Sequence, residues 1–314
     1  MKKRIFCFSL VSLLLLSSCN QTKSYPLEDY RKTMPFHVGF KILQLTDLHY
    51  CLSTDINQTN AVVKSEIDAS NPDLIVLTGD TFMAANKAIV NFTFSFLDTF
   101  NIPFAFTYGN HDLQGTYDTN YLHYAISQTK NALFVDYDDD NLYGRSNYFI
   151  DLLEGNTTKY RLYILDSNSY WKANSFVGYD VFHEEQIQHV ENIASTYGIV
   201  SSLAFFHLPL YEFKVAYQEY KEGLIEGNGV NNEKCTVSYT SSDAFERFKN
   251  VGIEGMFIGH NHTNYSTLDY QNVLLSYGVK STSEIYHKKI GYSVITLNSD
   301  HLKLTDIEKV FINE

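Results

Sequence analysis

Residues 74–80 read Leu-Ile-Val-Leu-Thr-Gly-Asp, an apolar run that ends in a glycine and a carboxylate. A short apolar run bounded by turn residues is typical of a strand that is buried on both faces. Runs of the same character occur at Ile42–Leu45, Pro103–Phe106, Leu203–Phe206 and Met256–Ile258. We expect all of these runs to be buried strands.

The segments between these runs have helical periodicity, with apolar residues recurring every three or four positions. Helices are expected at Ile56–Ala69, Ala84–Phe100 and Phe182–Tyr197. The second helix should bury one face, formed by Ile89, Phe92, Phe96 and Phe100. Alternation of strand and helix predicts an α/β fold with a partly parallel sheet. The C-terminal part should add antiparallel strands at Tyr265–Tyr270, Val273–Tyr277, Tyr292–Leu297 and Leu302–Thr305.

Each of the buried runs leads into side chains that bind metals. In chain order these are Asp47 and His49, Asp80, Asn110 with His111 and Asp112, His207, and His260 with His262. The carboxyl ends of strands in an open α/β sheet converge on one edge, where ligands bind. The sequence therefore predicts a metal site at that edge.

The spacing within these motifs favours convergence on an ion. Asp47 and His49 are two residues apart, as are His260 and His262, and alternate residues of an extended segment point the same way. Glycines stand just before the polar residues at positions 79, 109 and 259. Glycine allows the sharp turns that bring the chain close to a bound ion.

The series Asp-x-His, Gly-Asp, Gly-Asn-His-Asp, His and Gly-His-x-His resembles the calcineurin-like metallophosphoesterases over almost the whole mature chain. Three further segments are similar to the subgroup related to purple acid phosphatases: Ser146-Asn147-Tyr148, Leu165-Asp166-Ser167 and residues 205–209. Purple enzymes carry a tyrosine where this chain has Met83, so their tyrosine–iron bond is not expected. The implied fold is a four-layer αββα sandwich, in which two mixed β-sheets face each other, helices lie outside and the metals lie at one edge.

The resemblance also implies how the ligands are shared between two ions. The first ion would be held by Asp47, His49, Asp80 and His262. The second would be held by Asp80, Asn110, His207 and His260, so that Asp80 bridges the pair. Imidazole, carboxylate and amide donors without a thiolate suit Fe, Mn or Zn better than Ca or Mg.

His111 and Asp112 are the implied catalytic residues. His111 would lie over the phosphate, where it donates to a phosphoryl oxygen or protonates the leaving oxygen. Asp112 could hold the His111 ring in one orientation, as carboxylates often do for histidines. The implied reaction is hydrolysis of a phosphomonoester or phosphodiester by a metal-bound hydroxide, without a phosphoenzyme.

Two alternatives to a general phosphoesterase remain. One is a diesterase that acts on lipid head groups or nucleotides, which an open groove around Tyr211 and Asn228–Cys235 would favour. The other is a surface lipoprotein that binds a phosphorylated ligand without turnover. In every case the expected partner is a phosphorylated small molecule or lipid. The net charge of −12 argues against a nucleic acid polymer, although metal ions can supply local positive charge.

The N-terminal residues have the features of an export signal. Lys2, Lys3 and Arg4 precede an apolar run, Ile5–Leu16, that is shorter than the roughly 20 residues needed to span a bilayer. The ending Leu16-Ser17-Ser18-Cys19 resembles the lipobox of bacterial lipoproteins, which implies cleavage before Cys19 and acylation of that residue. An ordinary signal peptide is the alternative.

These features predict three parts of the chain. Residues 1–18 would be a lipoprotein signal peptide, residues 19–38 a polar tether that begins at the lipidated Cys19, and residues 39–314 a metallophosphoesterase domain. The protein would be exported and anchored to the bacterial cell membrane. Cys51 and Cys235 are expected as free or buried thiols, with a disulfide as the alternative. His183 should cap a helix, and the remaining histidines should be surface or cap residues: His37, His123, His189, His287 and His301.

Overall fold

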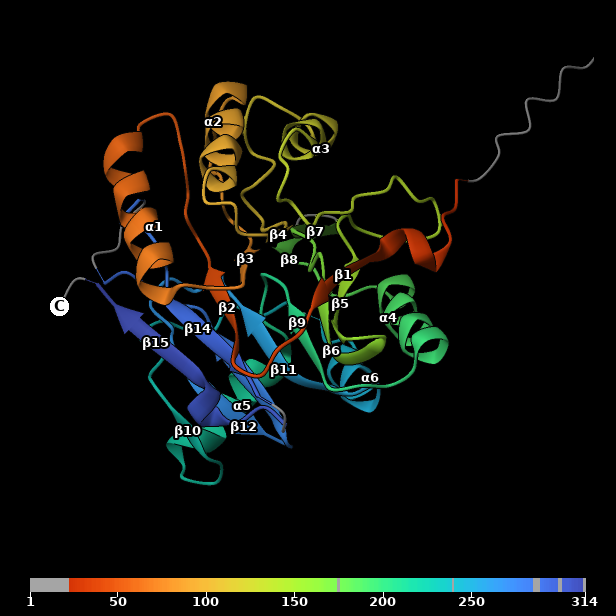
Figure 1. Cartoon of the computed structure of the whole chain (residues 1–314). Coiled ribbons are helices and arrows are strands. Elements are labelled where there is room, and N and C mark those ends of the chain that lie inside the picture. The colour runs from red at the N-terminus through yellow and green to blue at the C-terminus, as the bar shows by residue number, and fades with distance from the viewer. Residues whose placement is uncertain (1–22, 174–175, 239, 285–288, 299–300, 313–314) are drawn as a thin grey trace, which may run out of the picture.

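The computed structural model describes residues 23–173, 176–238, 240–284, 289–298 and 301–312 (Figure 1). Cys19, the predicted signal peptide and His287 lie outside these described residues. Within the described ranges, no helix has both the length and the apolar character needed to cross a membrane.

One sheet has five strands in the order β15-β14-β2-β3-β4. Strands β2, β3 and β4 are parallel, whereas β14 runs antiparallel to β2 and to β15. The bounds are β2 Phe40–Leu45, β3 Leu74–Thr78, β4 Phe104–Thr107, β14 Gly291–Leu297 and β15 Ile307–Phe311. The three parallel strands are the first three predicted runs, so their carboxyl ends lie at one edge as expected.

The other large sheet has eight strands in the order β1-β5-β6-β9-β11-β13-β12-β10 and is also mixed. Its bounds are β1 Arg31–Pro35, β5 Tyr148–Glu154, β6 Thr157–Ile164, β9 Ser202–Phe205, β10 Gly227–Asn228, β11 Ile253–Ile258, β12 Thr267–Tyr270 and β13 Val273–Tyr277. A separate antiparallel hairpin consists of β7 Tyr170–Ala173 and β8 Phe176–Tyr179.

The helices of the described chain follow the apolar periodicity. They are α1 Ile56–Ser70, α2 Lys87–Asp98, α3 Thr119–Ser127, α4 Glu184–Tyr197, α5 Tyr211–Lys221 and α6 Ala244–Asn250, with 3-10 turns η1 Leu27–Tyr30 and η2 Leu304–Asp306. Helix α1 begins where the Asp55 carboxylate accepts a hydrogen bond from Gln58 N, and it ends at Asn71 in a left-handed conformation. His183 is the N-cap of α4 within a capping box, as predicted.

The alternation of side chains along β2 shows how the layers stack. Leu43 and Leu45 pack in one hydrophobic core with Val63 of α1 and Phe94 of α2. Ile42, which points the other way, packs in the second core with the eight-stranded sheet. That second core also contains the buried faces of α4, α5 and α6, so helices cover the outer face of both sheets (Figure 1). The predicted αββα sandwich of two mixed sheets is confirmed.

Three sequence predictions are wrong. Part of the predicted tether, residues 31–35, is strand β1, whose backbone pairs in parallel with β5 at the sheet edge. The predicted strand Leu302–Thr305 overlaps the 3-10 turn η2, and the strand follows it as β15. Helix α2 buries Ile89, Val90, Phe94 and Leu97, whereas Phe92 is 47% exposed. Several apolar faces compete on this phenylalanine-rich helix, and packing against the sheet selects one of them.

Two further details concern single residues. Cys51 and Cys235 are buried free thiols, as predicted. The prediction that His189 is a surface or cap residue is wrong, because it lies inside α4 and is buried. Its Nε2 is 3.1 Å from the carbonyl oxygen of Asn147, and its ring packs edge-on against Tyr30. Burial lowers the pKa of His189 to about 4.

Candidate metal centre

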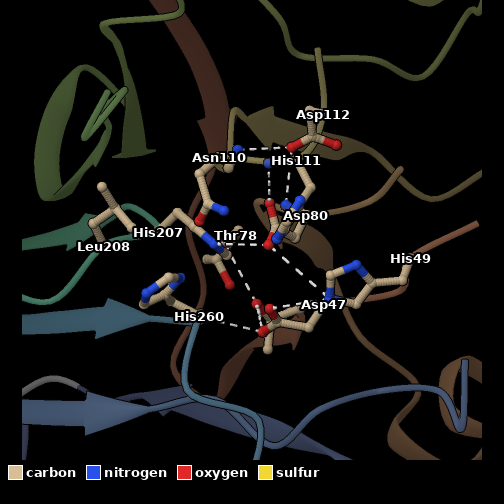
Figure 2. A network of polar contacts seen from close by, with 12 residues as sticks. Asp47, His49, Thr78, Asp80, Asn110, His111, Asp112, His207, Leu208 and His260 are labelled. Atoms are coloured by element: carbon tan, nitrogen blue, oxygen red, sulfur yellow. Dashed lines mark hydrogen bonds and ion pairs between the residues drawn. The ribbon is translucent and has the colours of Figure 1, made fainter. Parts of the chain in front are cut away.

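The predicted metal ligands meet at the carboxyl ends of β2, β3, β4, β9 and β11 (Figure 2). The ligand atoms of Asp47, His49 and His262 all lie within 4.8 Å of one another. The ligand atoms of Asp80, His207 and His260 form a second group that meets the same limit. These two groups follow the division between two ions that the resemblance implied.

Only one oxygen of the Asp47 carboxylate accepts hydrogen bonds from the described residues. Its Oδ2 accepts hydrogen bonds from Thr46 Oγ1 at 2.8 Å and from His260 N at 3.1 Å. Its Oδ1 is buried without a hydrogen-bond partner among the described residues and lies 3.3 Å from His262 Nε2. A buried carboxylate oxygen that faces a ring nitrogen in this way suits a shared cation.

Asp80 is oriented in the same manner. Its Oδ1 accepts a hydrogen bond from His111 N at 2.8 Å. Its Oδ2 lies 3.1 Å from His207 Nε2, in the second group, and 4.0 Å from His49 Nε2, in the first group. The second oxygen therefore lies between the two groups, which is the position of a bridging ligand.

His207 has its ring nitrogens assigned by their surroundings. The Thr78 carbonyl oxygen can only accept a hydrogen bond, and it lies 2.9 Å from His207 Nδ1. Nδ1 therefore donates, and Nε2 is left to face the Asp80 carboxylate. Burial alone would lower the pKa of His207, but the Asp80 carboxylate raises it to about 9. Likewise, burial alone would raise the pKa of Asp80, but His207 holds it well below its usual range. The shifts show that the Asp80 carboxylate makes the electrostatic potential at this position negative. A cation bound there would be stabilised.

Asn110 supplies an amide oxygen. Its Nδ2 donates to the Tyr170 hydroxyl at 3.1 Å, whereas its Oδ1 is buried without a partner among the described residues. Figure 2 shows this side chain beside Asp80 and His207. The orphaned oxygen fits the predicted role of Asn110 in the second group.

The backbone reaches this arrangement by turns rather than by extended chain. Asp47, His49, Asp80 and His260 have positive φ angles of 53°, 52°, 50° and 76°, in the left-handed region that side chains other than glycine rarely adopt. The prediction that these motifs are extended is therefore wrong, although their side chains converge. Left-handed turns at the strand ends bring Asp47 and His49 into one group, whereas His260 and His262 lie in different groups and do not face a single site as their spacing predicted.

Two positions require glycine because atoms of neighbouring residues lie too close for a Cβ atom. A Cβ atom at Gly109 would lie 2.3 Å from Asp80 Oδ1. At Gly79, which has a φ of +87°, a Cβ atom would lie 2.7 Å from the His207 ring. Any side chain at either position would push a ligand out of place, so the glycines are needed by the ligands they touch.

The structure corrects the prediction for Asp112. Its carboxylate is fully buried and accepts hydrogen bonds from the backbone N–H groups of Gly109, Asp80 and Phe82 at 2.6, 2.8 and 2.9 Å. It therefore ties the turn after β3 to the turn after β4 and does not orient the His111 ring. Gln114 does so instead, because its Oε1 accepts from His111 Nδ1 at 2.8 Å. A glutamine in a polar loop carries no sequence signal for this role.

Further supports come from the segment after β13, which the sequence did not single out. Lys280 is buried, and its Nζ donates to the Asp47 carbonyl oxygen at 2.6 Å. Thr282 Oγ1 donates to the Leu48 carbonyl oxygen at 2.7 Å. These bonds hold the left-handed turn that carries Asp47 and His49. Burial lowers the pKa of Lys280 to about 8.

The donors present fit two transition-metal ions: four imidazoles, two carboxylates and one amide oxygen, with an orphaned buried atom in each group. A four-layer sandwich with this donor set at one edge defines a dinuclear metalloprotein of the phosphoesterase type. The chain belongs to the calcineurin-like phosphoesterase family, whose sequence profile matches residues 40–264.

Comparisons with individual proteins agree with this assignment. The chain is 29% identical to the phosphatase DCR2 of Saccharomyces cerevisiae over 261 residues, a match that covers 72% of this chain and 44% of the yeast protein. It is 27% identical over 329 residues to the probable inactive purple acid phosphatase 29 of Arabidopsis thaliana, covering 88% and 81% of the two chains. Among solved structures, a dimetal phosphatase from Danio rerio has the same fold, with a TM-score of 0.58, 11% identity, and coverage of 88% and 99%.

Proposed function

We propose that this chain hydrolyses phosphate esters at the paired metal site. The observation that carries the proposal is the position of Asp80 Oδ2, which lies 3.1 Å from His207 Nε2 and 4.0 Å from His49 Nε2, between two complete ligand groups. The yeast relative is named as a phosphatase, whereas the Arabidopsis relative is named as probably inactive. Every metal-ligand position of the family motifs is filled in this chain, which favours activity here.

The roles of the residues follow from their contacts. Asp47, His49, Asp80 and His262 would hold one ion, and Asp80, Asn110, His207 and His260 the other. Bound ions of Fe, Mn or Zn would neutralise the phosphoryl oxygens and lower the pKa of a water molecule at the site.

His111 completes the proposed machinery. It is partly exposed, and its ring centroid is 5.7 Å from that of His49. Because its Nδ1 donates to Gln114, its Nε2 is the nitrogen that exchanges a proton with the ester. From this partly exposed position beside His49, it can donate to a phosphoryl oxygen or to the leaving oxygen.

A diesterase acting on a larger ester is the second candidate, and one observation favours it. An open groove of about 650 Å³ runs between helix α5 and the loop before Cys235. Tyr211, Val215 and Tyr217 give it apolar walls, and its charged lining consists of Lys214, Lys221 and Lys234 together with Glu219 and Glu233. These are the two segments whose opening would favour lipid head groups or nucleotides.

For the cellular location we propose an exported lipoprotein, acylated at Cys19 and anchored to the bacterial cell membrane. The support is the basic head, the short apolar run and the Leu-Ser-Ser-Cys ending of the sequence. Metabolic labelling with a fatty acid tests this proposal, because a Cys19→Ala variant should lose the label.

The experiment that tests the function is a screen of metal ions against substrates on the purified protein. Metal content is measured first, and turnover of an aryl monoester and a bis-aryl diester is then measured with Fe, Mn or Zn. Two ions per chain with turnover of either ester supports the proposal. Two ions without turnover of any ester favours a binding protein instead, and absence of paired ions overturns the site itself.

A further inference from the structure

The hairpin of β7 and β8 places two tyrosines directly against ligands of the second group. The Tyr170 hydroxyl accepts a hydrogen bond from Asn110 Nδ2 at 3.1 Å. The Tyr179 ring stands edge-on to the His260 ring, with centroids 4.5 Å apart and planes at 82°. Both tyrosines therefore touch side chains that belong to the proposed site, although neither belongs to a motif that the sequence analysis recognised.

The two tyrosines also form a continuous aromatic wall. Their ring centroids are 5.4 Å apart, and the planes meet at 27° in a stacked arrangement. Tyr179 is half-buried beside His260, whereas Tyr170 is 40% exposed. The wall thus runs from the partly buried His260 outward to solvent, on the side of the second ligand group.

The backbone beside the two rings also anchors the wall, in addition to the hydrogen bond between Asn110 and the Tyr170 hydroxyl. Asp180 N donates to the Ser169 carbonyl oxygen at 3.1 Å, closing the base of the hairpin. Ser238 Oγ donates to the Tyr179 carbonyl oxygen at 2.8 Å. The exposed face of Tyr170 is therefore held in place beside the site without being covered by these anchors.

A tyrosine face presented beside a phosphate site suits one class of ester. Aromatic rings gain about 0.5–1.5 kcal/mol from stacked or edge-on pairs beyond the effect of buried area, and saturated rings of equal size do not share this term. We infer that the Tyr170–Tyr179 wall selects phosphate esters whose organic group is a flat aromatic ring. The inference rests on the proposed function, because it assigns the substrate class of that same site.

Affinity measurements test this inference independently of catalysis. The probes are benzylphosphonate and cyclohexylmethylphosphonate, which have the same charge and nearly the same size and lack an ester bond to hydrolyse. Their affinities for the manganese-loaded full-length protein are measured by calorimetry. We expect the wild type to prefer the aromatic probe by about 2- to 12-fold, the range that corresponds to such ring pairs.

Substitutions of Tyr170 and Tyr179 distinguish the effect of the aromatic ring from that of the hydroxyl group. Tyr179→Ala and Tyr170→Ala should bring the preference close to one, and Tyr179→Leu keeps the bulk of the side chain in case the alanine variant fails to fold. Tyr170→Phe should keep the preference, because the ring remains. Val177→Ala is the matched control, since Val177 is 57% exposed on the same hairpin and should leave the preference unchanged.

The outcomes distinguish the two proposals. Equal affinity of the wild type for both probes, absence of binding by either, or a preference that survives Tyr179→Leu and Tyr170→Ala overturns the inference. Turnover of benzyl phosphate and cyclohexylmethyl phosphate is then compared. A protein that prefers benzylphosphonate but hydrolyses no ester contradicts the proposed function alone, whereas hydrolysis without any aromatic preference contradicts only the inference.

Discussion

The two sheets contribute different chemistry to the candidate metal centre. The five-stranded sheet supplies both carboxylates and the amide, Asp47, Asp80 and Asn110, together with the imidazole of His49. The eight-stranded sheet supplies only imidazoles, from His207, His260 and His262. All of the formal negative charge among the ligands thus comes from one half of the sandwich.

This difference in ligand type shows how the two sheets share the candidate metal site. Carboxylates determine where cations lie, because they carry the charge, and neutral imidazoles complete the coordination. The halves are also tied together, since His260 N donates to Asp47 Oδ2 and the Thr78 carbonyl accepts from His207 Nδ1. We therefore expect loss of the bridging carboxylate charge from the five-stranded half to affect both ions, and loss of one imidazole from the eight-stranded half to affect one.

The largest effect is expected for Asp80→Asn, which removes the bridging charge from the five-stranded half. Both ions should bind less tightly, and activity should fall by more than about 100-fold, or ~2.7 kcal/mol of transition-state stabilisation. Metal content per chain and initial rates measure the effect.

His207→Gln is the matched change in the other half and should lose one ion while retaining the other. Asp269→Asn, on β12, is the control for removing a carboxylate elsewhere. If Asp80→Asn and His207→Gln lost the same number of ions, the comparison between the halves would be wrong.

The next effect is expected for His111→Ala, which should keep both ions and lower kcat by about 100- to 10,000-fold, the usual contribution of a general acid or base. His111 lies outside both ligand groups, so metal content should match the wild type. Gln114→Ala should keep metal as well and lower kcat less, since it removes only the partner of His111 Nδ1. Loss of metal in His111→Ala would assign this residue to the ligands instead.

His189 lies on helix α4, outside the metal site, and should make the free energy of unfolding depend on pH. The folded-state pKa of His189 is lowered to about 4 by burial, below the unfolded value near 6.5. Between these values the unfolded chain binds a proton that the folded chain does not, so the free energy of unfolding falls as the pH decreases. At pH 5 the loss should be about 2 kcal/mol relative to pH 8.

His189→Gln should remove this part of the acid-side loss, because glutamine does not titrate and can donate to the Asn147 carbonyl. Urea denaturation of wild type and variant at pH 5 and pH 8 gives the difference. If the free energy of unfolding decreased between pH 8 and pH 5 by the same amount in wild type and His189→Gln, His189 would not be the source of the loss.

The smallest effect is expected for Thr46→Val, which keeps the shape of the side chain but removes the hydroxyl that donates to Asp47 Oδ2. The first ion should bind about 10-fold more weakly, as for other losses of a group that orients a ligand, and the second should be unaffected. Competition with a chelator measures both affinities. Thr99→Val on the surface is the control, and equal weakening of both ions would show that the two ligand groups do not respond separately to the loss of this hydrogen bond.

Much of the fold and the ligand set could be predicted from the sequence. The buried runs became β2, β3, β4, β9 and β11, because short continuous apolar stretches bounded by polar or turn residues are typical of buried strands. Residue types restrict chemistry in the same way. Asp, Asn and His at the ends of such runs predicted candidate ligands, and the fold brings the Asp and His side chains together in two groups.

The tertiary structure decided what depends on contacts distant in sequence. Asp112 turns to three backbone amides and leaves His111 to Gln114, and Lys280 reaches the Asp47 carbonyl from 233 positions away. The wall of Tyr170 and Tyr179 beside Asn110 and His260 belongs to no motif. Periodicity and residue type report on the local chain, whereas the direction of a side chain and the partner of each buried polar atom are set by the elements that pack around it.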